Sequence, residues 1–420
     1  MSAIVPFKGL REGVAAVRTQ RGLLFLDAYR WQLYLVPHTQ QPQEAFKFLL
    51  THGLAANSPV PPEQPRKTQM FSVQRDEAPA HKFIFSDQAR FQCSGCGTSC
   101  RSFRLGPLLP ADVDGLLSLD WSGTEHAQRQ FFVDRRDTLL DGEALRDGRE
   151  VFLRRANGGC QFLREDNLCE VHARFGYEKK PHTCRAFPLQ LRSTPSGVHA
   201  SLRLNECSRA EAADNGPSIA DDEPAIRGLW NQVDKVSMLP ALVWLSKGRL
   251  VGWEEYEALE RSLLESPPAG GGVEFLLRCC KALSAQVTPP DPCAPAALAA
   301  LCEWPIPSGL PVARAARLDA AGLTLEEGMA RLSLFSKDAF DFPDVLTGIA
   351  HQAIAAHLAR GRALDQAGRE GAPEATARHV NEAATFLTRI SLREHLAASG
   401  LDALAVVAAM RAFPEPLATP

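Results

Sequence analysis

The sequence contains no uninterrupted apolar run of the roughly 18 residues that mark a membrane-spanning helix. Its first fifteen residues also lack the charged start, the apolar stretch and the small-residue cleavage site of a secretory signal. We therefore expect a soluble, cytoplasmic protein that does not associate with membranes.

The chain also has little net charge. Its 46 basic and 49 acidic residues leave a formal charge of -3. Such a balance creates no field that would gather phosphates, so we do not expect nucleic-acid binding.

Several familiar enzyme motifs are missing. The sequence has no glycine-rich dinucleotide fingerprint after a strand, no phosphate-binding loop, no Gly-x-Ser-x-Gly elbow and no His-Glu-x-x-His pair. Standard nucleotide and hydrolase sites are therefore unsupported, and whether the protein is an enzyme stays open.

The 420 residues, 45% of them apolar and 23% charged, are typical of a globular protein with two or three folding units. We expect an α+β fold that is mainly α. Its parts are a small mixed α/β N-terminal unit (1–90), an irregular Cys-rich metal-binding domain (91–210) and an all-α C-terminal unit (224–420).

Local patterns support this division. Two apolar runs at 22–26 and 31–36 predict a β-hairpin, and proline at the start and Gly53 at the end bound a helix over 42–52. Apolar residues at helical spacing predict the helices of the last unit. These cover residues 226–245, 253–264, 273–283, 323–335, 345–358 and 382–410.

Eleven cysteines, an odd number in a chain without an export signal, favour metal binding or redox chemistry over structural disulfides. Cys93, Cys96 and Cys100 fall within eight positions, with Gly95 and Gly97 between them. A Cys-x2-Cys turn brings two sulfurs to roughly 3.5 to 4 Å, the separation that a tetrahedral ion requires.

Four more cysteines follow at loop-sized intervals, and Cys160 and Cys169 flank a turn that predicts a hairpin-like arrangement. The fold must bring this second group to the first, which couples metal binding to folding. The expected metal ligands are Cys93, Cys96, Cys100, Cys160, Cys169, Cys184 and Cys207. His172 and His182 stand nearby, but a lone histidine beside a turn is more often a surface or hydrogen-bonding residue.

Four thiolates around a divalent ion or a doubly positive iron-sulfur cube carry a net charge near -2, which donors or cations must offset. Arg101 and Arg185 each directly follow a cysteine. They are candidates to bind the cofactor in this way, with ordinary surface arginines as the alternative interpretation.

The cysteine blocks resemble those of the YkgJ-type cysteine cluster proteins, a family of zinc- or iron-chelating domains that includes flagellin lysine-N-methylases. The matching blocks are Cys93-x-x-Cys96-Gly97-x-x-Cys100-Arg101, Gly159-Cys160-x-Phe162-Leu163, Cys169-x-Val171-His172 and Lys180-Pro181-x-x-Cys184-Arg185-x-Phe187-Pro188. The resemblance covers about residues 91–207 and implies an iron-sulfur cluster, such as a 4Fe-4S centre, or Zn2+. Many members have two adjacent cysteines where this chain has Ser99-Cys100.

The other four cysteines, Cys279, Cys280, Cys293 and Cys302, lack ligand spacing, and we expect them to pack in the core. The favoured function is a metal-binding cysteine cluster protein with a role in redox chemistry or electron transfer. The alternatives are a structural zinc domain supporting a helical unit that binds an unknown protein partner, and a protein lysine N-methyltransferase.

Overall fold

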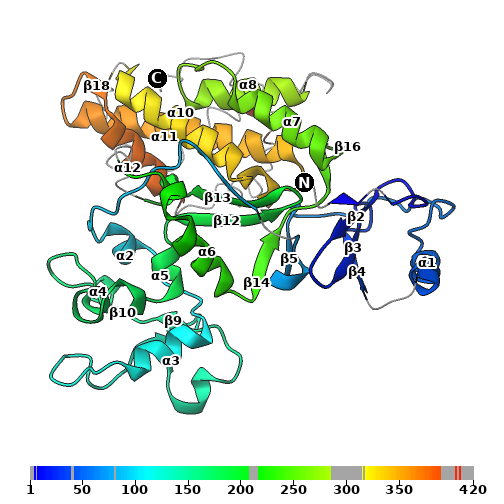
Figure 1. Ribbon diagram of the computed structural model, residues 1–420. Coiled ribbons are helices and arrows are strands. Elements are labelled where there is room, and N and C mark those ends of the chain that lie inside the picture. Colours follow the sequence, from blue (N-terminus) through cyan, green and yellow to red (C-terminus); the bar gives the residue numbers. More distant parts are fainter. Residues whose placement is uncertain are drawn as a thin grey trace. The chain divides into compact units, whose positions relative to one another are not determined.

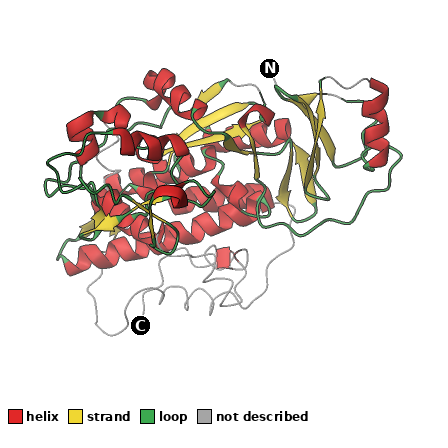
Figure 2. Cartoon of the chain, turned by 90° about the horizontal axis from the view of Figure 1, so that it is seen from below, coloured by secondary structure: helices red, strands yellow, loops and turns green. Residues whose placement is uncertain are grey.

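The chain passes four times between two compact units (Figures 1 and 2). The computed structural model describes residues 4–5, 7–38, 42–79, 82–207, 216–284, 315, 317–388, 403 and 406–407. The first unit comprises Met1–Ala89, Leu191–Asn205 and Asp234–Pro420, and the second comprises Arg90–Gln190 and Glu206–Val233. The N-terminal and C-terminal segments, expected as separate domains, thus belong to one unit.

The cause of this grouping is a five-stranded sheet in the order β5-β14-β12-β13-β6. Its strands are β5 (Phe71–Gln74), β6 (Phe83–Phe85), β12 (Leu189–Thr194), β13 (Gly197–Leu202) and β14 (Lys235–Met238). β14 pairs antiparallel with β5 and parallel with β12, while β13 pairs parallel with β6. Strands from all three expected segments therefore share one hydrogen-bonded layer.

A separate antiparallel sheet forms the N-terminal part of the first unit. It consists of β1 (Ile4–Val5), β2 (Val14–Arg18), β3 (Gly22–Asp27) and β4 (Gln32–Pro37), and α1 (Pro42–Thr51) follows. β3 and β4 form the predicted hairpin, with Leu24 opposite Leu35. Phe25, Val36 and Leu49 are buried together beneath it. The predicted helix is confirmed, and Gly53 after it has a φ of 66°.

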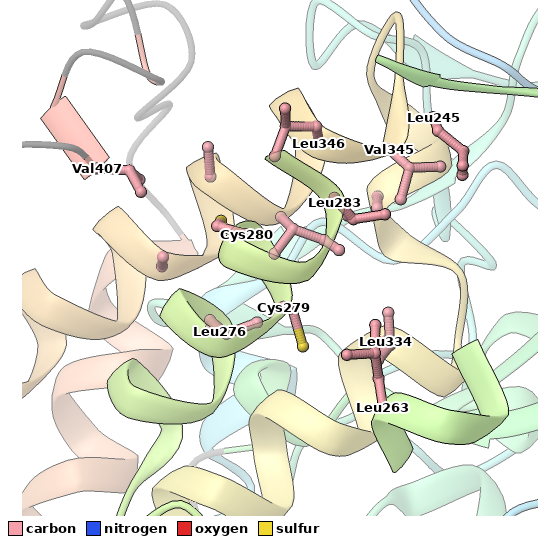
Figure 3. Close-up of a cluster of buried hydrophobic side chains, with 14 of the residues drawn as sticks. Leu245, Leu263, Leu276, Cys279, Cys280, Leu283, Leu334, Val345, Leu346 and Val407 are labelled. Atoms are coloured by element: carbon pink, nitrogen blue, oxygen red, sulfur yellow. The ribbon is translucent and has the colours of Figure 1, made fainter. Parts of the chain in front are cut away.

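Helices supply most of the remaining core. They are α7 (Trp253–Leu264), α8 (Gly272–Ser284), α10 (Ala320–Phe335), α11 (Val345–Arg369) and α12 (Ala377–Thr388). The side chains of Cys279 and Cys280 lie among leucines of these helices and are buried, as predicted (Figure 3). Cys293 and Cys302 lie outside the described residues, as does the predicted helix beyond Thr388 except at 403 and 406–407. None of the helices in the described part of the chain combines the length and apolarity needed to cross a membrane.

The single helix predicted over residues 226–245 is wrong. The structure has α6 (Glu223–Asn231), then β14, then β15 (Leu242–Ser246), which pairs with β16 (Arg249–Gly252). Val236 and Met238 are buried while Lys235 and Ser237 are exposed, which is the alternation of a strand. With β17 (Arg317–Leu318) and β18 (Glu374–Ala375), these strands also show that the segment 224–420 is not all-α. The class as a whole is α+β and mainly α, as predicted.

A buried ion pair connects α7 to the turn that follows α10. The Lys337 Nζ donates to both carboxylate oxygens of Glu260 at 2.7 Å, and the two side chains are 0% and 4% exposed. The same Nζ lies 3.1 Å from the Phe335 carbonyl oxygen and 3.2 Å from the His199 Nδ1. Burial lowers the pKa of Lys337 and raises the pKa of Glu260, while their mutual attraction opposes both shifts.

Candidate metal site

The second unit consists of short elements around an aromatic core. They are α2 (Thr98–Ser102), α3 (Pro110–Ser118), β7 (Phe132–Val133), β8 (Leu139–Leu140), β9 (Phe152–Leu153), β10 (Arg155–Ala156), β11 (Gly159–Cys160), α4 (Glu170–Phe175) and α5 (His182–Ala186), several of which are labelled in Figure 1. The ring of Trp121 stacks on that of Phe162, with centroids 5.2 Å apart. Cys160 belongs to this buried cluster, and three further cysteines pack against it: Cys100, Cys169 and Cys184.

A tight hairpin positions Cys160. β10 and β11 pair antiparallel with Arg155 opposite Cys160. The two connecting residues, Asn157 and Gly158, have φ angles of 50° and 77°. Asn-Gly at these positive φ angles is typical of the type I′ turn, which matches the twist of the two strands. The turn chemistry therefore fixes which residue of the hairpin faces the core.

Cys169 lies on the next turn of the chain. It forms an isolated antiparallel bridge with Leu163, and the Glu170 N–H donates to the Phe162 carbonyl oxygen at 2.8 Å. Cys169 is also the residue immediately before α4. The predicted hairpin-like arrangement around Cys160 and Cys169 is confirmed.

The first cysteine block packs against this turn. Gly97 precedes α2, which carries Cys100, and has a φ of 68°. A Cβ at Gly97 would lie 2.9 Å from the Arg101 Nη1, 3.1 Å from the Asn167 Cβ and 3.2 Å from the Leu163 Cδ1. Both the backbone angle and the lack of space favour glycine here. Segments some 60 residues apart in sequence are thus in close contact.

Four thiols interact with one another electrostatically. The pKa of Cys160 is raised to about 12, mainly by burial, with smaller contributions from Cys169 and Cys100. Burial likewise raises the pKa of Cys184, with added contributions from Cys160, Cys169 and Cys100. For Cys100, burial again comes first, followed by Cys169, and Cys93 is among the smaller contributors. The fold therefore brings Cys100, Cys160, Cys169 and Cys184 into one neighbourhood.

The remaining predicted ligands lie differently. Cys93 and Cys96 both act on the pKa of Cys100, which places them at the edge of the same neighbourhood, and Cys93 is exposed. Cys207 is 8% exposed and is not among the main influences on the shifted thiols. Six of the seven cysteines expected from the sequence therefore take part in these electrostatic interactions.

The cations that act on these thiols are Lys180, which lowers the pKa of Cys100 and Cys184, and Arg155, which lowers that of Cys160. Arg101 instead donates to the Asn167 Oδ1, and Arg185 donates to the Lys180 carbonyl oxygen at 2.9 Å and the Gln232 Oε1 at 2.6 Å. Sequence reasoning missed Arg155 entirely. Lys180 lies in one of the matching cysteine blocks, of which only Cys184 and Arg185 were predicted as site residues.

The two histidines near the cysteines make other contacts. His172 is exposed, and its ring centroid lies 5.8 Å from that of Tyr177. The His182 Nε2 lies 3.0 Å from the Leu229 carbonyl oxygen. Each ring thus has a contact that does not involve a thiol.

Within the described residues, no three His, Cys, Asp or Glu side chains meet in the geometry of a metal site. The chemistry of the donors fits a thiophilic metal nonetheless. Ligation requires thiolates, and burial together with the neighbouring thiols raises the pKa of Cys100, Cys160 and Cys184. A bound cation offsets both effects, so the four grouped thiols are the residues that could hold one.

An open pocket of about 530 Å³ reaches the thiol neighbourhood at Cys160. Arg101, Arg154 and Arg164 line it together with Glu125 and Glu165. This pocket gives solvent a route to Cys160, of which 8% is exposed. A metal site needs such an entry path.

Comparisons with family models, with curated proteins and with solved structures each found no match to this chain. The resemblance to the YkgJ-type proteins therefore depends on the motif residues alone.

Proposed function

We propose that the second unit binds a thiophilic metal centre, an iron-sulfur cluster or zinc, through Cys100, Cys160, Cys169 and Cys184. The observation that carries the proposal is that these four cysteines, which come from four separate blocks of the sequence, belong to or pack against one buried cluster and contribute to the raised pKa values of Cys100, Cys160 and Cys184. By contrast, no other cysteine within the described residues is among the main influences on the pKa of Cys279, which is buried in the helical core.

The protein's own residues have three tasks at this centre. Lys180 and Arg155 offset the negative charge that four thiolates bring. The aromatic core around Trp121 excludes water from the inner side, and the pocket at Cys160 admits solvent from the other. An iron-sulfur cluster, when bound, would supply one-electron transfer, whereas zinc would cross-link the four blocks.

We favour the iron-sulfur centre and a redox or electron-transfer role in the cytoplasm. Beyond the four grouped thiols, Cys93 and Cys96 lie at the edge of the neighbourhood, which gives more sulfur donors than one zinc ion needs. The exposed Cys93 also brings the thiol group to the protein surface, where a partner protein could approach.

Anaerobic purification followed by metal and acid-labile sulfide analysis tests the proposal. We expect a brown protein containing iron and sulfide; a colourless protein with zinc would support the structural alternative. Cys184→Ser should lose most of the metal, whereas the control Cys279→Ser, at a buried cysteine of the helical core, should keep it. A protein that binds neither metal after reconstitution, or equal loss in both variants, would contradict the proposed site.

A further inference from the structure

The guanidinium of Arg155 joins two of the cysteine blocks through backbone oxygens. Its Nη1 donates to the Phe103 carbonyl oxygen at 3.0 Å, and its Nη2 donates to the carbonyl oxygens of Arg101 and Gly158, the latter at 3.0 Å. Phe103 is the residue that ends α2, and Gly158 lies in the turn between β10 and β11. One side chain thus contacts both the helix of Cys100 and the hairpin of Cys160.

These carbonyl groups need a partner. The last carbonyl oxygens of a helix have no N–H group within the helix to accept a hydrogen bond from. A cation at a helix C-terminus also interacts favourably with the helix dipole. α2 has only five residues, so it has little stability of its own. Arg155 therefore holds in place a short helix that would otherwise fray at the end next to Cys100.

Packing at Gly159 supports the same connection. A Cβ at Gly159 would lie 3.4 Å from the Arg101 Cγ and 3.5 Å from the Arg101 Cα. α2 and β11 are therefore in contact beside the hydrogen bonds of Arg155, and the two blocks approach each other along both backbone and side-chain atoms.

We infer that Arg155 is a positioning residue that holds α2 against the β10–β11 hairpin and so sets how firmly Cys100 and Cys160 together retain a metal. This inference depends on the proposed metal centre. Its role is geometric: the planar guanidinium holds two nitrogens at fixed positions, one bonded to α2 alone and one to both α2 and the hairpin, whereas a lysine offers a single nitrogen. The role is separate from the positive charge, which a lysine would keep.

The test compares wild type with Arg155→Lys and Arg155→Met, each loaded with Co2+ in place of the native metal. Absorption in the thiolate charge-transfer and ligand-field bands reports the number of thiolates and the geometry around cobalt. Release of Co2+ to a chelator reports retention. Arg136→Lys is the matched control, because Arg136 is an exposed arginine of the same unit that lies outside the thiol neighbourhood.

We expect Arg155→Lys to fold with an unchanged circular dichroism spectrum but to release Co2+ roughly ten- to a hundredfold faster, from the loss of about two charge-assisted hydrogen bonds. Its cobalt bands should also weaken, while Arg136→Lys stays like wild type. If Arg155→Lys retains Co2+ as well as wild type and only Arg155→Met loses it, charge alone matters and the positioning role is refuted. If wild type itself shows no cobalt-thiolate bands, the metal centre fails and the inference fails with it.

Discussion

The buried pair of Lys337 and Glu260 gives a prediction whose magnitude depends on pH. Lys337→Met removes the ammonium that holds the Glu260 carboxylate at 2.7 Å and leaves that carboxylate 4% exposed without its cation. A buried, unpaired carboxylate takes up a proton instead of staying charged. The variant should therefore fold with Glu260 neutral.

The size of the loss follows from this protonation. The ordinary pKa of Glu260 is 4.5, so protonating it at pH 7 requires 2.5 pH units at about 1.36 kcal/mol each, or about 3.4 kcal/mol. That figure agrees with the roughly 3 to 5 kcal/mol found when one partner of a buried pair is removed. At pH 5 the pH lies only 0.5 unit above the ordinary pKa, and the free-energy cost of protonating Glu260 falls to about 0.7 kcal/mol.

The sign is consistent with linkage. In the variant the folded-state pKa of Glu260 lies above its unfolded value, so the stability of the variant is retained below about pH 4.5 and lost as the pH rises toward 7. Urea unfolding followed by circular dichroism at pH 5, 6 and 7 measures the difference from wild type at each pH.

The matched control is the double variant Lys337→Met with Glu260→Leu, which removes both charges of this pair. Its difference from wild type should lack the increase between pH 5 and 7 that Glu260 causes in the single variant, because that carboxylate is absent. A single variant that loses less than about 1 kcal/mol at pH 7, or the same amount at pH 5 and 7, would refute the reasoning.

Two further predictions concern titrating groups in the two units. In the folded apo protein, iodoacetamide at pH 7 should modify the exposed Cys93 well before Cys160, because a pKa of about 12 leaves roughly one Cys160 thiol in 10⁵ as the reactive thiolate. Mass spectrometry of the digested peptides measures the modification at each cysteine. Equal rates at the two cysteines would contradict the buried placement of Cys160. Hydrogen bonds from Arg378 and His379 lower the pKa of Glu370 from 4.5 to about 2, so its contribution to stability is present above pH 4.5 and lost as the pH falls toward 2. Glu370→Gln should therefore flatten the fall in thermal melting temperature over that range, and an unchanged fall would show that Glu370 contributes nothing to it.

Local patterns were sufficient where the structure depends on neighbours in sequence. The hairpin of β3 and β4 and the helix that begins at Pro42 follow from two apolar runs, a proline start and a glycine end. The turn between Cys160 and Cys169 follows from its polar residues in the same way. The packing of Cys100, Cys160, Cys169 and Cys184 around one cluster agrees with the expectation that the fold brings the later cysteines to the first block.

Patterns failed where distant partners decide the structure. The apolar residues at 236 and 238 fit either a helix or a strand, and their pairing with β5, more than 160 residues earlier, settles the matter. Glu260 and Lys337 are 77 residues apart, and no local signal marks either as buried. Arg155 acts through backbone oxygens, which any sequence provides, so its role has no motif.

The interleaving of the two units limits how they can be taken apart. A fragment cut at residues 91 and 210 would carry off β12 and β13 from the middle of the sheet and leave α6 behind. To express the thiol-bearing unit alone, residues 90–190 and 206–233 must be joined by a new linker in place of 191–205. The complementary piece needs two such joins, so a simple truncation series would damage both halves and report on neither.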